Sequence, residues 1–402
     1  MEDSHATIVK GSFLGQDLQY TENVRLIWEK NSIVEIEILD YEVDQGRGLA
    51  IPSFINGHIH IGDSFLKDLA FHETLVDIVK PPNGIKHTML SKTDEKTILK
   101  GMINTFKELW FNGQQGFIDF RENGLLGIER IERALDHVTN PILPFIFGRP
   151  RKTKESIEQL AYFAETNENI LGLNISSPNG WNDELINFLS SSLREKPNLL
   201  FSTHVSETGQ NAPKSQSRFG LSDTARILHF FKALQKQVIL VHLNFLVKND
   251  IDLIRQCSPS IVFCPRTASL FGNINFKKPP YKEIMEAGVN CALGTDNVML
   301  NAPDLFQEMN FFTRLLKSCY TDWKFDPREI LKMVTINPAR AVKMDHQIGS
   351  IEEGKDATFF IMETAHPTSI FMKNPYLQVI LRAHPGMIKE RYYKGQKYEG
   401  II

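Results

Sequence analysis

The stretch Leu49-Ala-Ile-Pro-Ser-Phe-Ile-Asn-Gly-His-Ile-His60 carries the strongest structural signal in this chain. Its apolar residues predict a buried β-strand that ends in two histidines, His58 and His60. Residues i and i+2 of a strand point to the same side, so the two imidazoles are expected to converge. Neutral imidazole is the commonest side-chain ligand of transition metals. The pair alone is a weak sign of a metal site, because twelve histidines in 402 residues also pair by chance.

Eight apolar segments, of which this stretch provides the first, alternate with amphipathic stretches of helical period. The predicted strands are Leu49–Ile55, Gly116–Phe120, Ile142–Phe147, Ile170–Ile175, Leu199–Thr203, Val238–Val241, Ile261–Phe263 and Asn290–Leu293. Such alternation predicts a parallel sheet, and eight units within about 300 residues predict a (β/α)8 TIM barrel. The alternative is an open doubly wound sheet, which normally has a glycine-rich phosphate loop after its first strand. Residues 57–62 do not supply that loop.

Both ends of the chain have the pattern of short strands separated by turn residues. Ser32–Leu39 alternates apolar and acidic residues, and Ala357–Met362, Tyr376–Leu381 and Lys389–Lys394 are also strand-like. We therefore predict an α/β fold with two domains. A distorted TIM barrel would cover residues 51–346, and a small β-sandwich would be composed of residues 1–50 and 347–402.

The predicted strand ends carry possible metal ligands and acids. The fifth strand leads to His204, with Glu207 three residues later, the sixth leads to His242 and the eighth leads to Asp296. A barrel would bring these groups to one mouth, where imidazole and carboxylate donors suit zinc, and iron or manganese nearly as well. Each residue also has a purely structural interpretation. A histidine can pack in the core, Asp296 can cap a helix, and Glu207 can be a solvated loop residue.

Several segments, in the same order along the chain, resemble motifs of the amidohydrolase superfamily. They are Ile51–His60, Ser202–Glu207, Val241–Leu243, Leu293–Asn297 and Gly349–Asp356. The resemblance is closest to the branch of cytosine, guanine and adenosine-type deaminases and triazine hydrolases, which carries His-x-x-Glu on its fifth strand. The predicted fourth strand contains no lysine that could bridge two metal ions, which agrees with a mononuclear site.

The resemblance implies one divalent metal ion, zinc before iron or manganese, bound by His58, His60, His204 and Asp296. It also implies that His242 hydrogen-bonds the attacking water or the substrate, that Glu207 moves protons, and that Asp296 accepts the proton of the water. The implied activity is deamination of a small heterocyclic amine, nucleobase-like, nucleoside-like or amidine-like, by a metal-activated hydroxide. Removal of chloride or an alkylamine from a triazine-like ring is the alternative. A non-catalytic scaffold is disfavoured because every expected ligand is present.

Polar residues in the loops after the strands are candidates for substrate contacts. Arg121, Arg149, Arg151 and Arg266 follow the second, third and seventh strands, where an arginine could clamp a carboxylate or phosphate. Asn301 follows the eighth strand and is a further candidate. Ion pairing within the protein is an equally good interpretation of each arginine.

Composition limits the partners and the compartment. The formal net charge of −3 predicts no general affinity for nucleic acid or an anionic membrane, so the expected partner is a small-molecule substrate. The first residues lack the pattern of a secretory leader, and the four cysteines form no Cys-x-x-Cys pair. Both observations predict a cytoplasmic protein with reduced thiols. A homo-oligomer is compatible with the sequence, which shows no particular interface.

Overall fold

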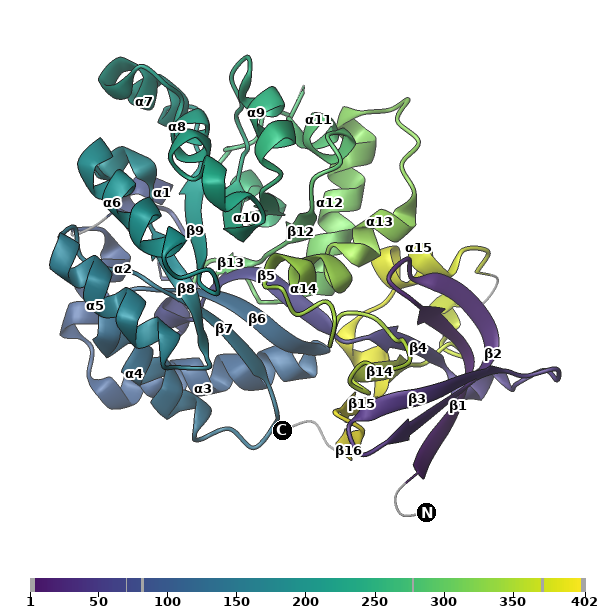
Figure 1. Ribbon diagram of the computed structural model, residues 1–402. Coiled ribbons are helices and arrows are strands. Elements are labelled where there is room, and N and C mark those ends of the chain that lie inside the picture. Colours follow the sequence, from purple (N-terminus) through teal and green to yellow (C-terminus); the bar gives the residue numbers. More distant parts are fainter. Residues whose placement is uncertain (1–3, 70, 81–82, 277, 370–371, 399–402) are drawn as a thin grey trace.

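Two β-sheets organise the computed structural model, which describes residues 4–69, 71–80, 83–276, 278–369 and 372–398. In Figure 1 a parallel sheet surrounded by helices occupies the left and centre, and a second sheet lies at the lower right. The second sheet combines purple strands from the start of the chain with yellow strands from its end.

The larger sheet has nine strands, and all of its strand pairs are parallel. Their spatial order is β12 (Cys291–Leu293), β11 (Ser260–Phe263), β10 (Val238–His242), β9 (Leu200–Val205), β8 (Ile170–Ile175), β7 (Leu143–Gly148), β6 (Gln114–Arg121), β5 (Phe54–His60) and β13 (Asp296–Asn297). The alternating pattern in the sequence therefore predicted the parallel sheet correctly.

Both faces of this sheet are buried, which explains why its strands are apolar along their whole length. Ile146 and Leu240 belong to the large core cluster that the surrounding helices share. Ile118, Phe120 and Val241 belong to a second buried cluster. A parallel sheet covered on both faces cannot show the polar–apolar alternation of a half-exposed sheet.

Fourteen helices of the described chain connect or surround these strands. They are α1 (Leu75–Val79), α2 (Ile85–Lys92), α3 (Glu95–Phe111), α4 (Gly124–Leu135), α5 (Lys154–Glu165), α6 (Asp183–Arg194), α7 (Asn211–Phe219), α8 (Asp223–Phe230), α9 (Asp250–Cys257), α10 (Pro265–Leu270), α11 (Tyr281–Glu286), α12 (Leu305–Cys319), α13 (Pro327–Lys332) and α14 (Ile336–Ala341). Several begin at side-chain caps: Asp94, Thr153 and Asn182 accept hydrogen bonds from backbone N–H groups three residues later.

The eighth predicted strand, Asn290–Leu293, corresponds to β12, and Gly294 and Thr295 separate β12 from the short strand β13. β12 pairs with β11, whereas β13 pairs with β5, so this short segment joins the last part of the sheet to its first strand. The backbone N–H of Thr295 donates to the His58 carbonyl at 3.0 Å. A Cβ atom on Gly294 would lie 2.6 Å from the His58 nitrogen, so only glycine permits this approach.

The smaller sheet has seven strands, four from the start of the chain and three from its end. Their order is β16 (Gln396–Tyr398), β15 (Ile388–Tyr393), β14 (Phe359–Met362), β4 (Leu49–Pro52), β1 (Ser4–Leu14), β2 (Gln19–Glu29) and β3 (Ser32–Ile38). Hydrogen bonding joins them in one continuous sheet, where two facing sheets were expected of a sandwich. The predicted first strand, Leu49–Ile55, is divided between the two sheets, and the predicted domain boundaries stay a prediction.

The predicted strand Tyr376–Leu381 is wrong, because this segment is helix α15 (Pro375–Leu381). Asn374 caps the helix by accepting from the backbone N–H of Leu377, and Pro375 occupies the first turn. Both are helix-start signals that outweigh the apolar pattern.

Polar contacts join the smaller sheet to helix α3, which packs beside the larger sheet. Arg391 of β15 donates to the carbonyl oxygens of Trp110 and Phe111 at the end of α3, at 3.1 and 2.7 Å. In the part of the chain that the structure describes, no helix is long and apolar enough to cross a membrane.

Candidate metal centre and pocket

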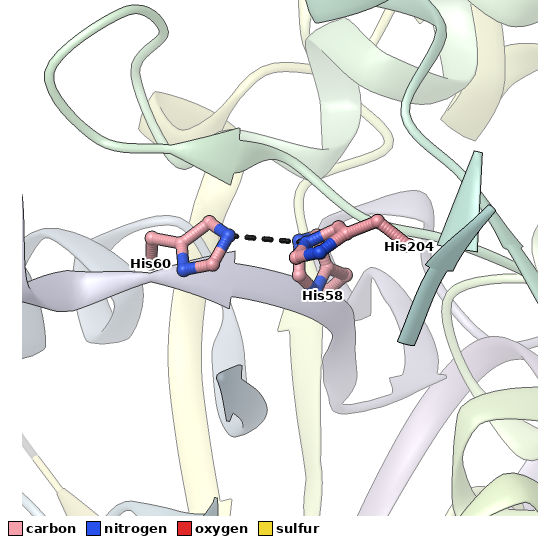
Figure 2. A group of neighbouring side chains, drawn as sticks. All are labelled: His58, His60 and His204. Carbon is pink, nitrogen blue, oxygen red and sulfur yellow. Dashed lines mark hydrogen bonds between the residues drawn. The ribbon is translucent and has the colours of Figure 1, made fainter. Parts of the chain in front are cut away.

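Three histidines meet at the carboxyl ends of β5 and β9. His58 and His60 stand two residues apart on β5, and His204 lies on β9. Figure 2 shows the three rings turned toward one another. The Nε2 atom of His204 lies 3.2 Å from Nε2 of His58 and 3.3 Å from Nε2 of His60. All three side chains are buried.

The other ring nitrogens determine the state of two of these imidazoles. Nδ1 of His60 lies 3.2 Å from the Phe120 carbonyl oxygen, and Nδ1 of His204 lies 2.8 Å from the Ser176 carbonyl oxygen. A carbonyl only accepts, so each Nδ1 carries the proton. Burial holds the pKa of both imidazoles well below the ordinary value, so both rings are neutral. The Nε2 lone pairs of His60 and His204 therefore face each other and repel. A cation bound between them would replace this repulsion with two attractive contacts.

Asp296 supplies a carboxylate to the same point. Its Oδ1 lies 3.6 Å from Nε2 of His58 and 3.7 Å from Nε2 of His60. Its backbone has a φ of 63°, a strained conformation for aspartate that turns the side chain toward the histidines. The Thr267 hydroxyl hydrogen-bonds Asp296, and Asn301 donates to that hydroxyl at 2.8 Å.

Three imidazole nitrogens and one carboxylate oxygen are donors whose chemistry suits a zinc ion. Four ligands held at about 2.0–2.1 Å in a tetrahedral arrangement lie about 3.3 Å from one another. The four separations given above, out of the six that four donors define, are 3.2–3.7 Å, and the ligand atoms of the three histidines all lie within 4.8 Å of one another. Nδ1 of His58 is buried without a hydrogen-bond partner among the described residues, so this ring has no other polar role in the protein.

His242 and Glu207 lie beside these donors. Nε2 of His242 is 3.7 Å from Oε1 of Glu207, and His242 has a φ of 81° at the end of β10. Burial lowers the pKa of His242 to about 3. Burial, reinforced by the charge of Asp296, raises the pKa of Glu207 to about 8. Cys264 offers a thiol close to His242 and Asp296.

A network of buried ion pairs forms the wall near His60. The Lys86 ammonium contacts Asp63 at 3.1 Å and also pairs with Glu122, whose other oxygen pairs with Arg121. Burial favours the neutral forms, but the opposite charges outweigh it. They raise the pKa of Lys86 and hold the pKa of Glu122 well below its ordinary value. Oε1 of Glu122 lies 3.4 Å from Nδ1 of His60, so the network reaches the metal centre.

His60, His204 and Asp296 line one pocket together with Lys86 and Glu122, and this solvent-open pocket has a volume of about 200 Å³. We call the lining residues His60, His204, His242 and Asp296 the ligand wall, and Lys86 and Glu122 the ion-pair wall. Arg149 lines the pocket as well.

Comparison with known proteins identifies the family. The chain matches the Amidohydrolase family over residues 49–393. It belongs to this family.

Two relatives extend the likeness over most of the chain. This amidohydrolase is 32% identical to a putative aminohydrolase of Methanothermobacter thermautotrophicus over 362 residues, 88% of each chain. It is 23% identical to a 5-methylthioadenosine/S-adenosylhomocysteine deaminase of Pyrococcus furiosus over 388 residues, 89% of this chain and 85% of the relative.

A solved structure shares the fold. The adenosine deaminase of Xanthomonas campestris with bound zinc gives a TM-score of 0.82 at 17% identity, covering 98% of this chain and 92% of that one. At this identity the likeness concerns the fold alone.

The substrate candidates predicted in this amidohydrolase differ in position. Arg149 lines the pocket, whereas Arg121, Arg266 and Asn301 are not among the lining residues. Arg121 pairs with Asp119 and Glu122. Arg266 lies 3.4 Å from Glu308 and donates to the Ala302 carbonyl. Arg121 and Arg266 therefore form ion pairs within the protein, which is the alternative interpretation given above for the arginines. Asn301 donates a hydrogen bond to Thr267.

Sequence reasoning missed Lys86 and Asp63. Both belong to the long connection between β5 and α3, residues 61–94, in which no charged residue was predicted to serve the site. The available signal was its length, since a connection of more than about 15 residues after a strand often serves a functional site.

Proposed function

We propose that this amidohydrolase is a metal-dependent aminohydrolase that deaminates a small heterocyclic amine. The observation that carries the proposal is the pair of opposed Nε2 lone pairs on His60 and His204, with Asp296 beside them. This arrangement has no role in an apolar core, because it leaves buried acceptors facing one another.

The metal centre would consist of one zinc ion held by His58, His60, His204 and Asp296. When bound, such an ion makes hydroxide available from water near neutral pH. The structure of a related fold with bound zinc and the donor separations support this choice of metal.

The protein's own residues would move the protons. Asp296 would accept the proton that leaves the attacking water, and neutral His242 would hydrogen-bond that water. Glu207, whose pKa of about 8 keeps it protonated at neutral pH, would donate to a ring nitrogen and make the adjacent carbon electrophilic. A C–O bond then forms, and the proton held by Asp296 passes through Glu207 to the amino group. The C–N bond breaks, ammonia leaves, and the proton of the new hydroxyl group returns to Glu207 as the C=O bond forms, while the ring nitrogen keeps the proton it received.

Several observations support an aminohydrolase of this kind. One relative is named a putative aminohydrolase, and another is named for the deamination of two nucleosides. An acid placed to protonate a ring nitrogen suits amidine-like rings, in which the amino-bearing carbon is next to such a nitrogen. Removal of chloride or an alkylamine from a triazine-like ring stays a prediction that no contact in the pocket specifically favours.

We also propose that the parallel sheet is a closed eight-stranded barrel, in which β12 and β13 are two halves of the eighth strand. Their pairing with β11 and β5 supports this closure. The seven-stranded sheet would form the second domain, composed of both ends of the chain.

Ammonia release tests the function. Zinc-loaded protein is offered aminated nucleobases, nucleosides, guanidino compounds and chlorotriazines, and ammonia and chloride are measured in parallel. We expect ammonia from at least one aminated ring and none from an Asp296→Asn variant. Release of chloride alone, or of neither product, would contradict the proposal.

A further inference from the structure

A second cavity adjoins the metal centre and is rich in arginine. It is lined by His87, Glu122, Arg130, Arg149 and Arg151, among other residues, and has a volume of about 620 Å³. It shares His87, Glu122 and Arg149 with the pocket of the metal centre, so Arg149 lies between the two. We infer that the substrate carries an oxyanion group, phosphoryl or carboxylate, which binds at Arg149 and extends toward Arg151. This inference rests on the proposed function and narrows its substrate class.

Arg149 stands without an ion-pair partner among the described residues. Its Nε donates to Oδ1 of Asn174 at 3.0 Å, and no carboxylate of the described residues forms an ion pair with its guanidinium. Burial and the charge of Arg121 lower its pKa although Glu122 and Asp119 act in the opposite direction. A charge in such a place is normally paired, so the missing anion is expected to arrive with a ligand.

The neighbouring acid is already neutralised. Glu122 pairs with Lys86 and Arg121 and acts on Arg149 only through its charge, without an ion pair. The other two arginines of the cavity differ: Arg130 pairs with Glu95 at 2.8 Å, whereas the side chain of Arg151 forms no hydrogen bond or ion pair within the described chain. The cavity therefore presents two free guanidinium groups, whose planar fork suits phosphate and carboxylate oxygens.

The position of Arg149 matches a substrate that reaches from the metal centre into this cavity. It lines the same pocket as His60, His204 and Asp296. Its charge also lowers the pKa of His58 and His204, which places it within electrostatic range of the donors. A ring at the metal centre and an oxyanion at Arg149 can therefore belong to one molecule.

Binding of inorganic phosphate and of malonate to the full-length, metal-free protein tests the inference by calorimetry. Removing the metal excludes binding of the probe to zinc. We expect at least one probe to bind, and the stronger of the two identifies the group as phosphoryl or carboxylate. Arg149→Met should weaken that binding at least about 10-fold, and Arg151→Met about 3-fold.

The control is Arg255→Met, because Arg255 is exposed on α9 and pairs with Asp252 away from the pocket. It should leave binding unchanged. Arg149→Lys keeps the positive charge but lacks the planar guanidinium group, so it should bind the probe with intermediate affinity. Such binding would show that the loss in Arg149→Met is not caused by misfolding. Absence of binding for both probes, or equal affinity in the Arg149 and Arg255 variants, would overturn the inference.

Turnover then separates this inference from the proposed function. Zinc-loaded protein is compared on adenosine and on adenosine 5′-monophosphate, as a matched pair of neutral and anionic ligands. A higher kcat/KM for the anionic member, lost in Arg149→Met, supports both proposals. Anion binding without ammonia release from any aminated ring supports the subsite and contradicts the aminohydrolase.

Discussion

The two walls of the pocket are both buried and polar, yet they differ in what they lack. On the ligand wall, His60 and His204 turn unprotonated Nε2 atoms toward each other at 3.3 Å. On the ion-pair wall, Lys86 contacts two carboxylates, Asp63 and Glu122. The second wall is electrically satisfied, whereas the first is incomplete without a cation. An unsatisfied group is therefore a better sign of a ligand site than burial or charge alone.

The largest expected effect follows from breaking the ligand wall. His204→Ala removes one of four donors, so zinc content measured by mass spectrometry should fall and ammonia release should decrease by at least about 10³-fold. His229→Ala, on an exposed histidine of α8, is the matched control and should keep both. Full zinc occupancy in His204→Ala would contradict the assignment of this wall.

Removing a charge from the ion-pair wall should lower the free energy of unfolding. Lys86→Met leaves Asp63 and Glu122 buried without their ammonium, which should lower the free energy of unfolding by about 3–5 kcal/mol. Lys67→Met removes the partially exposed pair with Glu108 and should cost only about 0–1 kcal/mol. Urea denaturation followed by circular dichroism compares them, and equal losses would show that the wall contributes no special stability.

The contact between Glu122 of the ion-pair wall and His60 of the ligand wall should raise the affinity of the candidate metal centre for zinc. Glu122→Gln removes the negative charge 3.4 Å from Nδ1 of His60, which helps to orient that ring. Zinc affinity, measured by competition with a chelating dye, should fall about 10–100-fold. Glu184→Gln, which alters an exposed pair with Lys154, should leave the affinity unchanged.

The smallest effect concerns pH and Glu207. The folded protein keeps this carboxyl protonated up to a pKa of about 8, whereas the unfolded chain loses the proton near the ordinary value of 4.5. Between these values the folded state binds more protons, so the stability of the metal-free protein falls as pH rises. Its side chain is 23% exposed, so we expect about 1–2 kcal/mol from pH 5 to pH 8. Glu207→Gln should flatten that slope, and an unchanged slope would assign the effect to other carboxyls.

Much of the parallel sheet could be predicted from the sequence, and so could the positions of the candidate metal ligands at the ends of its strands. Continuous apolar segments depend on local pattern, and the period of two places His58 and His60 on one side of β5. The positions of His204, His242 and Asp296 then follow from the ends of parallel strands. What they bind stays a prediction, although their side chains meet in one pocket.

The remaining features depend on contacts between distant segments. Lys86 reaches the pocket from a long connection whose path no periodicity describes. Arg149 and Arg266 look alike in sequence as arginines after strands, but only Arg266 finds a carboxylate, Glu308, 42 residues away along the chain. Whether an arginine is paired or free is decided by tertiary packing.

The junction at Gly294 and Thr295 has a consequence for how the protein folds. Asn56 donates to the Thr295 hydroxyl at 2.7 Å across 239 residues of chain, and the same junction sets Asp296 beside β5. Closing so long a loop is entropically costly and slow, so Asp296 joins the three histidines only when the two ends of the sheet have met. Zinc uptake during refolding should therefore mark completion of the tertiary structure, and a nascent chain that stops before residue 296 cannot form the full coordination site.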